Sequence, residues 1–256
     1  MSEPNTVAKT SDDVIIRTYN ITKVYLLGSV EKVYALRGIS VDVRRGEYLS
    51  ILGPSGSGKS TFFNMVGALD RPTEGHVMVD GYNLQTLNQR QLAWIRCHKM
   101  GYIFQQFNLI QTMSALENVA LPRIFAGESP AEAREQAAEI LKVVGLGHRL
   151  THLPSQVSGG QQQRIAIARA LVNRPSIILA DEPTGNLDLK TGEEIISLLG
   201  EMKERFGITI ITATHDMKML RASDTVVWIK DGRADRIAHK GEFNVSIGTI
   251  DGKTLA

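Results

Sequence analysis

The stretch that most constrains this 256-residue chain runs from residue 49 to residue 61 and reads Leu-Ser-Ile-Leu-Gly-Pro-Ser-Gly-Ser-Gly-Lys-Ser-Thr. A short apolar run leads into a glycine-rich turn, which leads into a lysine and two hydroxyl residues. A short apolar run bounded by a turn is typical of a buried strand. The stretch therefore predicts a strand, a tight loop and a helix start, whose backbone N–H groups can bind an anion.

Gly53, four further residues and Gly58-Lys59-Ser60 have the spacing of a phosphate-binding P-loop. Glycine permits close approach of the backbone, Lys59 brings positive charge to the β- and γ-phosphates, and the Ser60 hydroxyl can bind Mg²⁺. An ordinary glycine-rich turn before a helix is the alternative. The residues predicted to bind the nucleotide here are Gly53, Pro54, Ser55, Gly56, Ser57, Gly58, Lys59, Ser60 and Thr61.

The composition is that of a globular protein, with 43% hydrophobic and 22% charged residues. A formal net charge of +2 gives no reason to expect nucleic acid as a partner. The single cysteine, Cys97, excludes an intramolecular disulfide and a cysteine-based metal cluster. No apolar run approaches the roughly 20 residues needed to span a bilayer, so we expect any work at a membrane to use a partner.

Hydrophobic periodicity indicates one α/β domain that includes a small antiparallel sheet and an all-helical insertion, with a tail at each end of the chain. Residues 1–13 are predicted to be a disordered tail, and residues 240–256 a C-terminal tail. Alternating residues over 14–25 and 34–43 predict a small antiparallel sheet, with a loop at 26–32. Residues 106–157 change to helical patterns, and Ser129, Pro130 and Glu132 form a strong helix start. We therefore expect one domain over 14–239, interrupted by an all-helical insertion at about 106–157.

The remaining elements follow from strand and helix patterns in alternation. We expect helices at 59–69, 88–98, 161–173 and 189–206, with a short one at 217–222. We expect strands at 76–79, 100–104, 177–180, 208–214, 225–230 and 233–238.

Two carboxylates, Asp181 and Glu182, follow the apolar strand predicted at 177–180. Catalytic residues of open α/β sheets tend to lie at the carboxyl ends of strands. Asp181 is therefore placed to hold Mg²⁺, and Glu182 to polarise a water molecule as a general base. Seen alone, two such acids often only begin a solvated loop, but beside a P-loop the catalytic interpretation is favoured.

A second glycine-containing helix start reads Ser158-Gly159-Gly160-Gln161. Ser158 and Gln161 have the spacing of a capping box, and the two glycines leave N–H groups available for an anion. One chain thus has two helix N-termini suited to phosphate. If both bind one nucleotide, they could come from different subunits.

Three further residues are weaker candidates when taken one at a time. Tyr25 could stack on an adenine ring or pack beneath the sheet. His215 follows a strand and could reach the γ-phosphate or orient water, although such a histidine is more often a surface residue. Gln105, at the border of the helical insertion, could touch Mg²⁺ or water and report the nucleotide state to the insertion.

Taken together, these motifs resemble the nucleotide-binding domains of ATP-binding-cassette (ABC) proteins over residues 14–239. The P-loop, Gln105, the signature Ser158-Gly159-Gly160-Gln161, Asp181-Glu182, Asn186-Leu187-Asp188 and His215 occur in the family's order. Phe104 to Leu109, Ala115 to Pro122 and Ala180 to Asp188 resemble the lipoprotein-release, macrolide-efflux and cell-division branch (LolD, MacB and FtsE types). Val157 where many members have leucine, and Ile110-Gln111 where this branch often has Leu-Pro, depart from the pattern.

The resemblance implies a P-loop ATPase fold and a head-to-tail homodimer with two ATP–Mg²⁺ between its subunits. Each ATP would lie between Lys59 of one subunit and Ser158 of the other, with Asp188 at the same interface and Tyr25 on adenine. Glu182, His215, Lys59 and Gln105 would be the catalytic set, and Ser60, Gln105 and Asp181 the Mg²⁺ ligands. The insertion would act on a separate FtsX/MacB-like permease, which would hold the protein at the cytoplasmic face of the inner membrane.

Two alternatives come from other functional classes. A soluble ABC ATPase of translation or DNA repair would have two cassettes in one chain or a long coiled coil between the motifs. This chain has one motif set and a short insertion over 106–157. A binding module that only senses ATP would not need Lys59, Asp181, Glu182 and His215 together.

Overall fold

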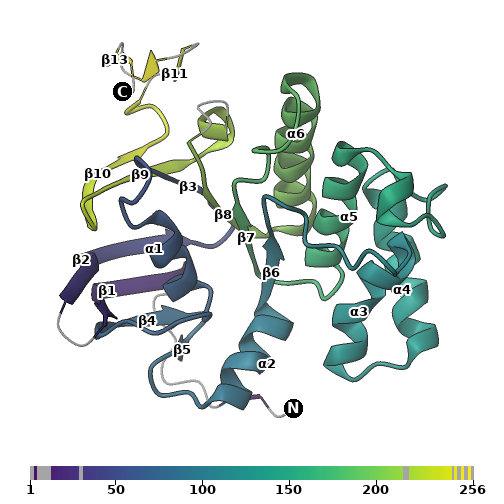
Figure 1. Ribbon diagram of the computed structural model, residues 1–256, viewed down its shortest axis with the longest axis horizontal. Coiled ribbons are helices and arrows are strands. Elements are labelled where there is room, and N and C mark those ends of the chain that lie inside the picture. The colour runs from purple at the N-terminus through teal and green to yellow at the C-terminus, as the bar shows by residue number, and fades with distance from the viewer. Residues whose placement is uncertain are drawn as a thin grey trace.

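The computed structural model describes residues 3–4, 13–28, 31–215, 219–243, 245–246, 249–250 and 253–254. Figure 1 shows an antiparallel sheet at one side of the molecule, a parallel sheet in the middle and a pair of helices at the other side. Most of the N-terminal tail predicted at 1–13 lies outside the described part, whereas residues 240–243, 245–246, 249–250 and 253–254 of the C-terminal tail are described. Of the N-terminal tail, Pro4 is buried and Glu3 accepts a hydrogen bond from the hydroxyl of Tyr82.

The central sheet has six strands in the order β10-β9-β3-β8-β7-β6. Five of them are parallel, and β10 pairs antiparallel with β9 as the predicted hairpin. The strands are β3 (Tyr48–Leu52), β6 (Met100–Ile103), β7 (Ile177–Asp181), β8 (Thr209–Ala213), β9 (Thr225–Lys230) and β10 (Arg233–His239). Parallel strands that are buried on both faces explain why these segments read as near-continuous apolar runs.

The antiparallel sheet has four strands in the order β2-β1-β4-β5. They are β1 (Val14–Leu27), β2 (Glu31–Arg44), β4 (Glu74–Val79) and β5 (Tyr82–Asn83). The loop predicted at 26–32 is shorter than expected, because Leu26 and Leu27 still pair with Lys32 and Glu31. Because β1 and β2 pair with each other, both strands continue beyond the residues in which apolar and polar side chains alternate.

The α-helices are α1 (Lys59–Val66), α2 (Gln89–Lys99), α3 (Ala115–Ala126), α4 (Pro130–Val143), α5 (Gly159–Leu171) and α6 (Leu189–Phe206). Two short 3₁₀ helices are η1 (Pro154–Gln156) and η2 (Met219–Ala222). The predicted capping box at α4 is confirmed, because the hydroxyl of Ser129 accepts from the N–H of Glu132 and the Glu132 carboxylate accepts from Ser129. Helix α1 ends at Val66 rather than at Leu69, because Gly67 and the left-handed Ala68 turn the chain there.

Three further short strands, β11 (Val245–Ser246), β12 (Thr249–Ile250) and β13 (Lys253–Thr254), form a small antiparallel sheet within the segment that the sequence analysis treats as a C-terminal tail. In the part of the chain that the structure describes, no helix is both long and apolar enough to cross a bilayer.

Two large apolar clusters lie on opposite faces of the central sheet. Successive side chains of a strand point to opposite faces, so Ile177 and Leu179 of β7 join α1 and the antiparallel sheet in one cluster. Ile178 and Ala180 join α5, α6 and the helices α3 and α4 in the other. The helical insertion therefore shares its apolar core with the parallel sheet.

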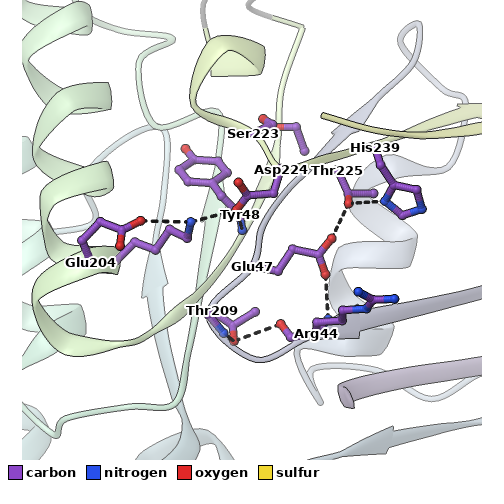
Figure 2. Close-up of polar contacts among 12 residues, drawn as sticks. Arg44, Glu47, Tyr48, Glu204, Thr209, Ser223, Asp224, Thr225 and His239 are labelled. Carbon is purple, nitrogen blue, oxygen red and sulfur yellow. Dashed lines mark hydrogen bonds and ion pairs between the residues drawn. The ribbon is translucent and has the colours of Figure 1, made fainter. Parts of the chain in front are cut away.

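A polar network ties α6 to the amino ends of β3 and β9 (Figure 2). The Nζ atom of Lys203 lies 2.8 Å from the carboxylate of Asp224, which also accepts from the backbone N–H of Tyr48 at 2.9 Å. The hydroxyl of Thr225 donates to Glu47 and lies 2.9 Å from Nδ1 of His239. The network fixes the edge of the sheet opposite to the candidate site.

Candidate nucleotide-binding and hydrolysis site

The predicted site residues follow neighbouring strands of the central sheet. The P-loop follows β3, Gln105 follows β6, Asp181 ends β7 and His215 follows β8. These four strands are parallel, so their carboxyl ends lie at one edge. Ligands of open α/β sheets bind at this edge.

The P-loop turns directly into α1, and the loop's shape depends on two glycines. A Cβ atom on Gly53 would lie 2.1 Å from the carbonyl oxygen of Ile229, and one on Gly58 would lie 2.5 Å from that of Ala35. Gly58 also has φ = 109°, a left-handed conformation that side chains rarely adopt. Both positions therefore require glycine for the loop to pack against β9 and β2.

Helix α1 differs from the other α-helices at its N-terminus. Its N-cap, Gly58, provides no side-chain hydrogen bond. In the described part of the chain every other α-helix has a capping side chain: Asn88, Ser114, Ser129, Ser158 or Asp188. The first N–H groups of α1 are thus left for a bound anion, an arrangement that favours phosphate binding.

The ammonium group of Lys59 lies inside the loop. Its Nζ atom donates to the carbonyl oxygens of Gly53 at 2.6 Å and Pro54 at 3.0 Å. Ser60 is exposed beside it at the helix start, and Ser57 is buried with a hydroxyl that has no hydrogen-bond partner among the described residues. The loop thus gathers one positive charge and several hydroxyl groups at the N-terminus of α1.

The two carboxylates at the end of β7 have different surroundings. Burial raises the pKa of Asp181, the adjacent negative charge of Glu182 raises it further, and Lys59 opposes the rise. Asp181 is half-buried, and its carboxylate oxygens are of the kind that divalent cations such as Mg²⁺ prefer.

Glu182 is held from several directions. Its Oε1 atom lies 2.7 Å from Nδ1 of His215, and its Oε2 atom accepts from the hydroxyl of Thr214 at 3.2 Å. Its backbone has φ = 44°, a left-handed conformation that is costly for a side chain of this size. The N–H of Glu182 donates to the carbonyl of Ala213 at 2.9 Å. These contacts fix the backbone turn and the direction of the carboxylate.

Gln105 lies against the segment that follows Glu182. A Cβ atom on Gly185 would lie 2.7 Å from Nε2 of Gln105. The carbonyl of Gln105 accepts from Nδ2 of Asn186 at 2.9 Å. The start of the helical insertion is thus attached to the chain that leads from the carboxylates to α6.

The second glycine-containing helix start is α5, and its capping box is confirmed. The hydroxyl of Ser158 accepts from the N–H of Gln161 at 3.3 Å, and the Gln161 side chain accepts from the N–H of Ser158 at 3.1 Å. A Cβ on Gly160 would lie 2.4 Å from Cγ2 of Thr191, and one on Gly159 would lie 3.6 Å from Leu187. Within one chain, this helix start therefore packs against the segment that begins α6.

The last two candidate residues have clear positions. Asp188 is the N-cap of α6: its carboxylate accepts from the N–H of Thr191 at 3.1 Å and from its hydroxyl at 2.6 Å, and these hydrogen bonds lower its pKa. Tyr25, near the end of β1, is partly exposed, and its hydroxyl donates to Asp70 at 3.1 Å.

Sequence reasoning did not identify three residues that organise this edge. Thr214 contacts Glu182, as described above. The guanidinium of Arg169 on α5 donates to the carbonyls of Phe107, at 2.8 Å, and Asn108. The buried Gln163 donates to the carbonyl of Pro183 at 2.7 Å. Gln163 could have been recognised as a polar residue on the apolar face of a helix, because a buried polar side chain is almost always hydrogen-bonded.

An uncapped helix after a glycine loop, with a lysine in the loop and carboxylates at the end of a neighbouring parallel strand, defines a P-loop nucleoside triphosphatase. A family model described as ABC transporter matches residues 36–185. The chain belongs to this family and is an ATP-binding and ATP-hydrolysing cassette of the ABC type.

Similar proteins agree with this assignment. The chain is 50% identical over 227 residues to an ABC transporter ATP-binding protein of Thermotoga maritima, covering 89% of this chain and 96% of the relative. It is 46% identical to the lipoprotein-releasing system ATP-binding protein LolD of Shewanella denitrificans, with 83% and 91% covered. It is 46% identical to the macrolide export ATP-binding/permease protein MacB of Rhodopirellula baltica, covering 85% of this chain but 32% of that protein.

A solved structure, the dimeric post-hydrolysis ATP-binding cassette MJ0796 bound to ADP and Pi, has a TM-score of 0.80 and 47% identity, and covers 88% of this chain and 98% of that one. The corresponding protein of Methanocaldococcus jannaschii is 49% identical over 226 residues. The likeness confirms the predicted α/β ABC ATPase fold.

Proposed function

We propose that this chain is the ATP-hydrolysing subunit of a transporter or mechanotransmission complex of the LolD, MacB and FtsE branch. It works as a head-to-tail homodimer around two ATP–Mg²⁺, and drives a separate membrane permease. The contact of Glu182 with His215 carries the proposal, because it places a candidate general base beside a second proton-bearing group at the nucleotide edge.

The residues at this edge of the sheet have different roles in binding and hydrolysing ATP. The N–H groups at the start of α1 and the ammonium of Lys59 bind the phosphates, and Glu182 polarises the attacking water while His215 fixes its carboxylate. Ser60, Asp181 and Gln105 supply oxygen atoms, the donors that Mg²⁺ prefers. When bound, Mg²⁺ supplies positive charge to the phosphate oxygens. Burial raises the pKa of Asp181, and a bound cation would oppose that rise.

The dimer accounts for the second helix N-terminus. Ser158, Gly159 and Gly160 lie at the start of α5 beside Leu187 and the cap residue Asp188, so these groups form one surface. A partner's ATP would lie on this surface and close the site of each subunit. The dimeric cassette bound to ADP and Pi supports this proposal, because it is 47% identical to this chain. ATP then favours the closed dimer, and hydrolysis removes the contact that holds it shut.

The permease would dock in an apolar cavity of about 660 Å³ between the central sheet and the insertion. Its walls come from α2 and β6 on one side and from α3 on the other, where Leu121, Pro122 and Phe125 line it. The side chains of Leu69 and Phe125 at its rim are 48% and 66% exposed. The MacB relative supports a permease as the occupant, because this chain matches one third of a protein named as ATP-binding and permease in one.

The half-buried Cys97 and Asn173 lie in the same cavity, and the amide of Asn173 donates to the carbonyl of Pro122 at 3.2 Å. This contact joins the insertion to the chain directly after α5, the helix that begins at the signature, so movement of the docked permease and of α5 would be coupled. Attachment through the permease would hold the ATPase at the cytoplasmic face of the inner membrane.

Affinity purification from native membranes tests this function. The tagged Glu182→Gln variant is isolated with ATP, and co-purifying proteins are identified; Lys59→Ala is the control because it lacks the phosphate contact. We expect a permease with few membrane helices and a large extracytoplasmic domain, recovered with Glu182→Gln and depleted with Lys59→Ala. Recovery of ribosomes or DNA-repair proteins without a permease would instead assign the chain to the soluble class.

A further inference from the structure

We propose that Asp70, together with Lys23, is a positioning group for Tyr25 and holds its ring for stacking on the adenine base of ATP. The inference rests on the nucleotide site proposed above. It concerns a cluster of three side chains, Lys23, Tyr25 and Asp70, which lie together where β1 meets the end of α1. The three residues do not form a sequence motif.

The cluster is centred on the carboxylate of Asp70. Its Oδ2 atom accepts from the hydroxyl of Tyr25 at 3.1 Å and lies 2.7 Å from Nζ of Lys23. Its Oδ1 atom accepts from Nζ of Lys23 at 2.8 Å and from the N–H of Arg71 at 2.7 Å. The carbonyl of Arg71 also accepts from Lys23 at 2.8 Å. Both oxygens of Asp70 are therefore occupied by donors that fix its position.

Protonation states agree with a charged carboxylate in this cluster. Burial alone raises the pKa of Asp70, but the hydrogen bonds from Lys23, Arg71 and Tyr25 outweigh it and lower the pKa below the ordinary value. For Tyr25, burial and the bond to Asp70 raise the pKa, and a hydrogen bond with Thr61 opposes this only in part, so the phenol keeps its proton and donates it to Asp70. The contact between a charged acceptor and a neutral donor is of the stronger, charge-assisted kind.

The ring of Tyr25 is consequently held at both ends. Its Cβ atom is fixed by β1, where Tyr25 pairs with Val33 of β2, and its hydroxyl is fixed by Asp70. The Nζ atom of Lys23 lies over the ring, 5.0 Å from its centroid. With a cation over one face, the opposite face of the partly exposed ring is the one that can receive a base.

The position of Asp70 links this ring to the phosphate site. Asp70 follows α1 in sequence, and its N–H donates to the carbonyl of Asn64 on that helix at 3.2 Å. Figure 1 shows α1 beside β1 and β2, and helix and strands are in contact. One rigid helix thus carries the phosphate-binding N–H groups at its start and the anchor for Tyr25 just beyond its end. This arrangement fixes the spacing between phosphates and base before ATP arrives, which reduces the ordering cost of binding.

The test measures ATP affinity by titration calorimetry in EDTA, which prevents hydrolysis. Tyr25→Phe removes the hydroxyl but leaves the ring and the Lys23–Asp70 pair, and Asp70→Asn weakens the anchor. We expect each variant to bind ATP about three- to tenfold more weakly, and the double variant to bind no more weakly than either one. Tripolyphosphate, which has no base, should bind all variants equally.

Two controls keep the outcomes separate. Asp42→Asn breaks the ion pair of Arg17 with Asp42, whose side chains lie 2.8 Å apart. This pair joins the same two strands at a position remote from Tyr25, so the substitution should leave ATP affinity unchanged. In a Tyr25→Ala background, Asp70→Asn should have no further effect. If Tyr25→Ala itself binds ATP normally, the proposed adenine contact fails. If Tyr25→Ala weakens ATP binding but Asp70→Asn leaves it unchanged or strengthens it, the adenine contact of Tyr25 is retained and the positioning role of Asp70 is refuted.

Discussion

The Nδ1 atom of His215 lies 2.7 Å from Oε1 of Glu182, although the two residues follow different strands and are 33 positions apart in the chain. The side chain of Glu182 is 15% exposed and that of His215 is 76% exposed. The carboxylate is therefore largely enclosed by protein, while the imidazole is exposed at the carboxyl edge of the sheet. This contact explains why the acid and the histidine should affect hydrolysis in different ways.

Glu182→Gln should leave ATP binding intact and reduce ATP hydrolysis by about a hundred- to ten-thousand-fold, the range for removal of a general base. The amide has the shape of the carboxylate but does not take up a proton. Phosphate release and ATP-dependent dimer formation, the latter by size-exclusion chromatography, are the measurements. Glu139→Gln on the surface of α4 is the control. Normal hydrolysis by Glu182→Gln would show that another group is the base.

His215→Ala should reduce hydrolysis by at least about tenfold while the affinity for ATP in EDTA stays within twofold of the wild type. The imidazole holds Glu182 but does not contribute to the binding loop, so binding and turnover should separate. Affinity and hydrolysis are measured on the same preparation. A parallel loss of affinity would mean that His215 acts mainly in binding ATP.

Gly101→Ala should lower the free energy of unfolding by about 1–3 kcal/mol, the usual cost of overpacking. A Cβ on Gly101 of β6 would lie 2.3 Å from the backbone oxygen of Ala170 on α5, and neither backbone can easily move. Gly200→Ala on α6 is the matched control, because in the described part of the chain no atom beyond its own neighbours and helix backbone lies within 4 Å of its Cβ position. We expect that control to be more stable by about 0.5–1 kcal/mol. Urea denaturation of both variants tests the pair.

Asp80→Asn should destabilise the fold at neutral pH by about 1–3 kcal/mol. Burial alone raises the pKa of Asp80, but ion pairs with Lys99 and Arg45 outweigh it and lower the pKa. A lowered acid pKa stabilises the folded state above the unfolded pKa of about 4 and loses that effect as the pH falls through the folded pKa. The difference in unfolding free energy should therefore be largest above about pH 5 and shrink below about pH 4.

Asparagine is a suitable replacement for this test, because Asp80 has φ = 48° and asparagine tolerates left-handed backbone. Arg17 and Asp42 form a more exposed pair, so Asp42→Asn should change stability by less than about 1 kcal/mol at any pH. A constant difference between wild type and Asp80→Asn from pH 3 to pH 7 would contradict the ionic explanation.

Phe125→Glu should reduce recovery of the permease by at least about tenfold without changing the ATPase activity of the isolated chain. Phe125 is exposed at the rim of the apolar cavity, so a charge there affects docking more than folding. Phe206→Glu, which changes another exposed phenylalanine outside that cavity, is the control. Equal permease recovery with both variants would place the docking site elsewhere.

Local sequence signals were sufficient for most elements of the fold. The capping box at Ser129 predicted where α4 begins, because the capping groups lie within four residues. Helix α5 begins at Gly159, directly after its capping residue Ser158 and two residues before the helix expected at 161–173. Helix α6 was predicted with its observed bounds, 189–206, from its amphipathic period. The lengths of β1 and β2 were underestimated, since the pairing of Leu26 with Lys32 depends on the partner strand rather than on local alternation.

The P-loop and the two carboxylates could be read from short motifs, because each motif lies within a few neighbouring residues. The residues that position these motifs could not be identified from the sequence. Asp70 meets Tyr25 across 45 positions, and Arg169 reaches Phe107 across 62 positions. Glu182 gains its left-handed backbone from packing against β8, which no local pattern indicates. Such contacts require the topology of the sheet to be known.

The apolar cluster that joins α3 and α4 to α5, α6 and β7 has a consequence for protein engineering. The insertion is one segment in sequence, yet Val119 and Leu141 share their packing with Ile165 and Ile178. A graft of residues 106–157 from a relative with a different permease would replace one half of a shared interior. Such a chimera should fold well only if the facing side of α5 is exchanged with it.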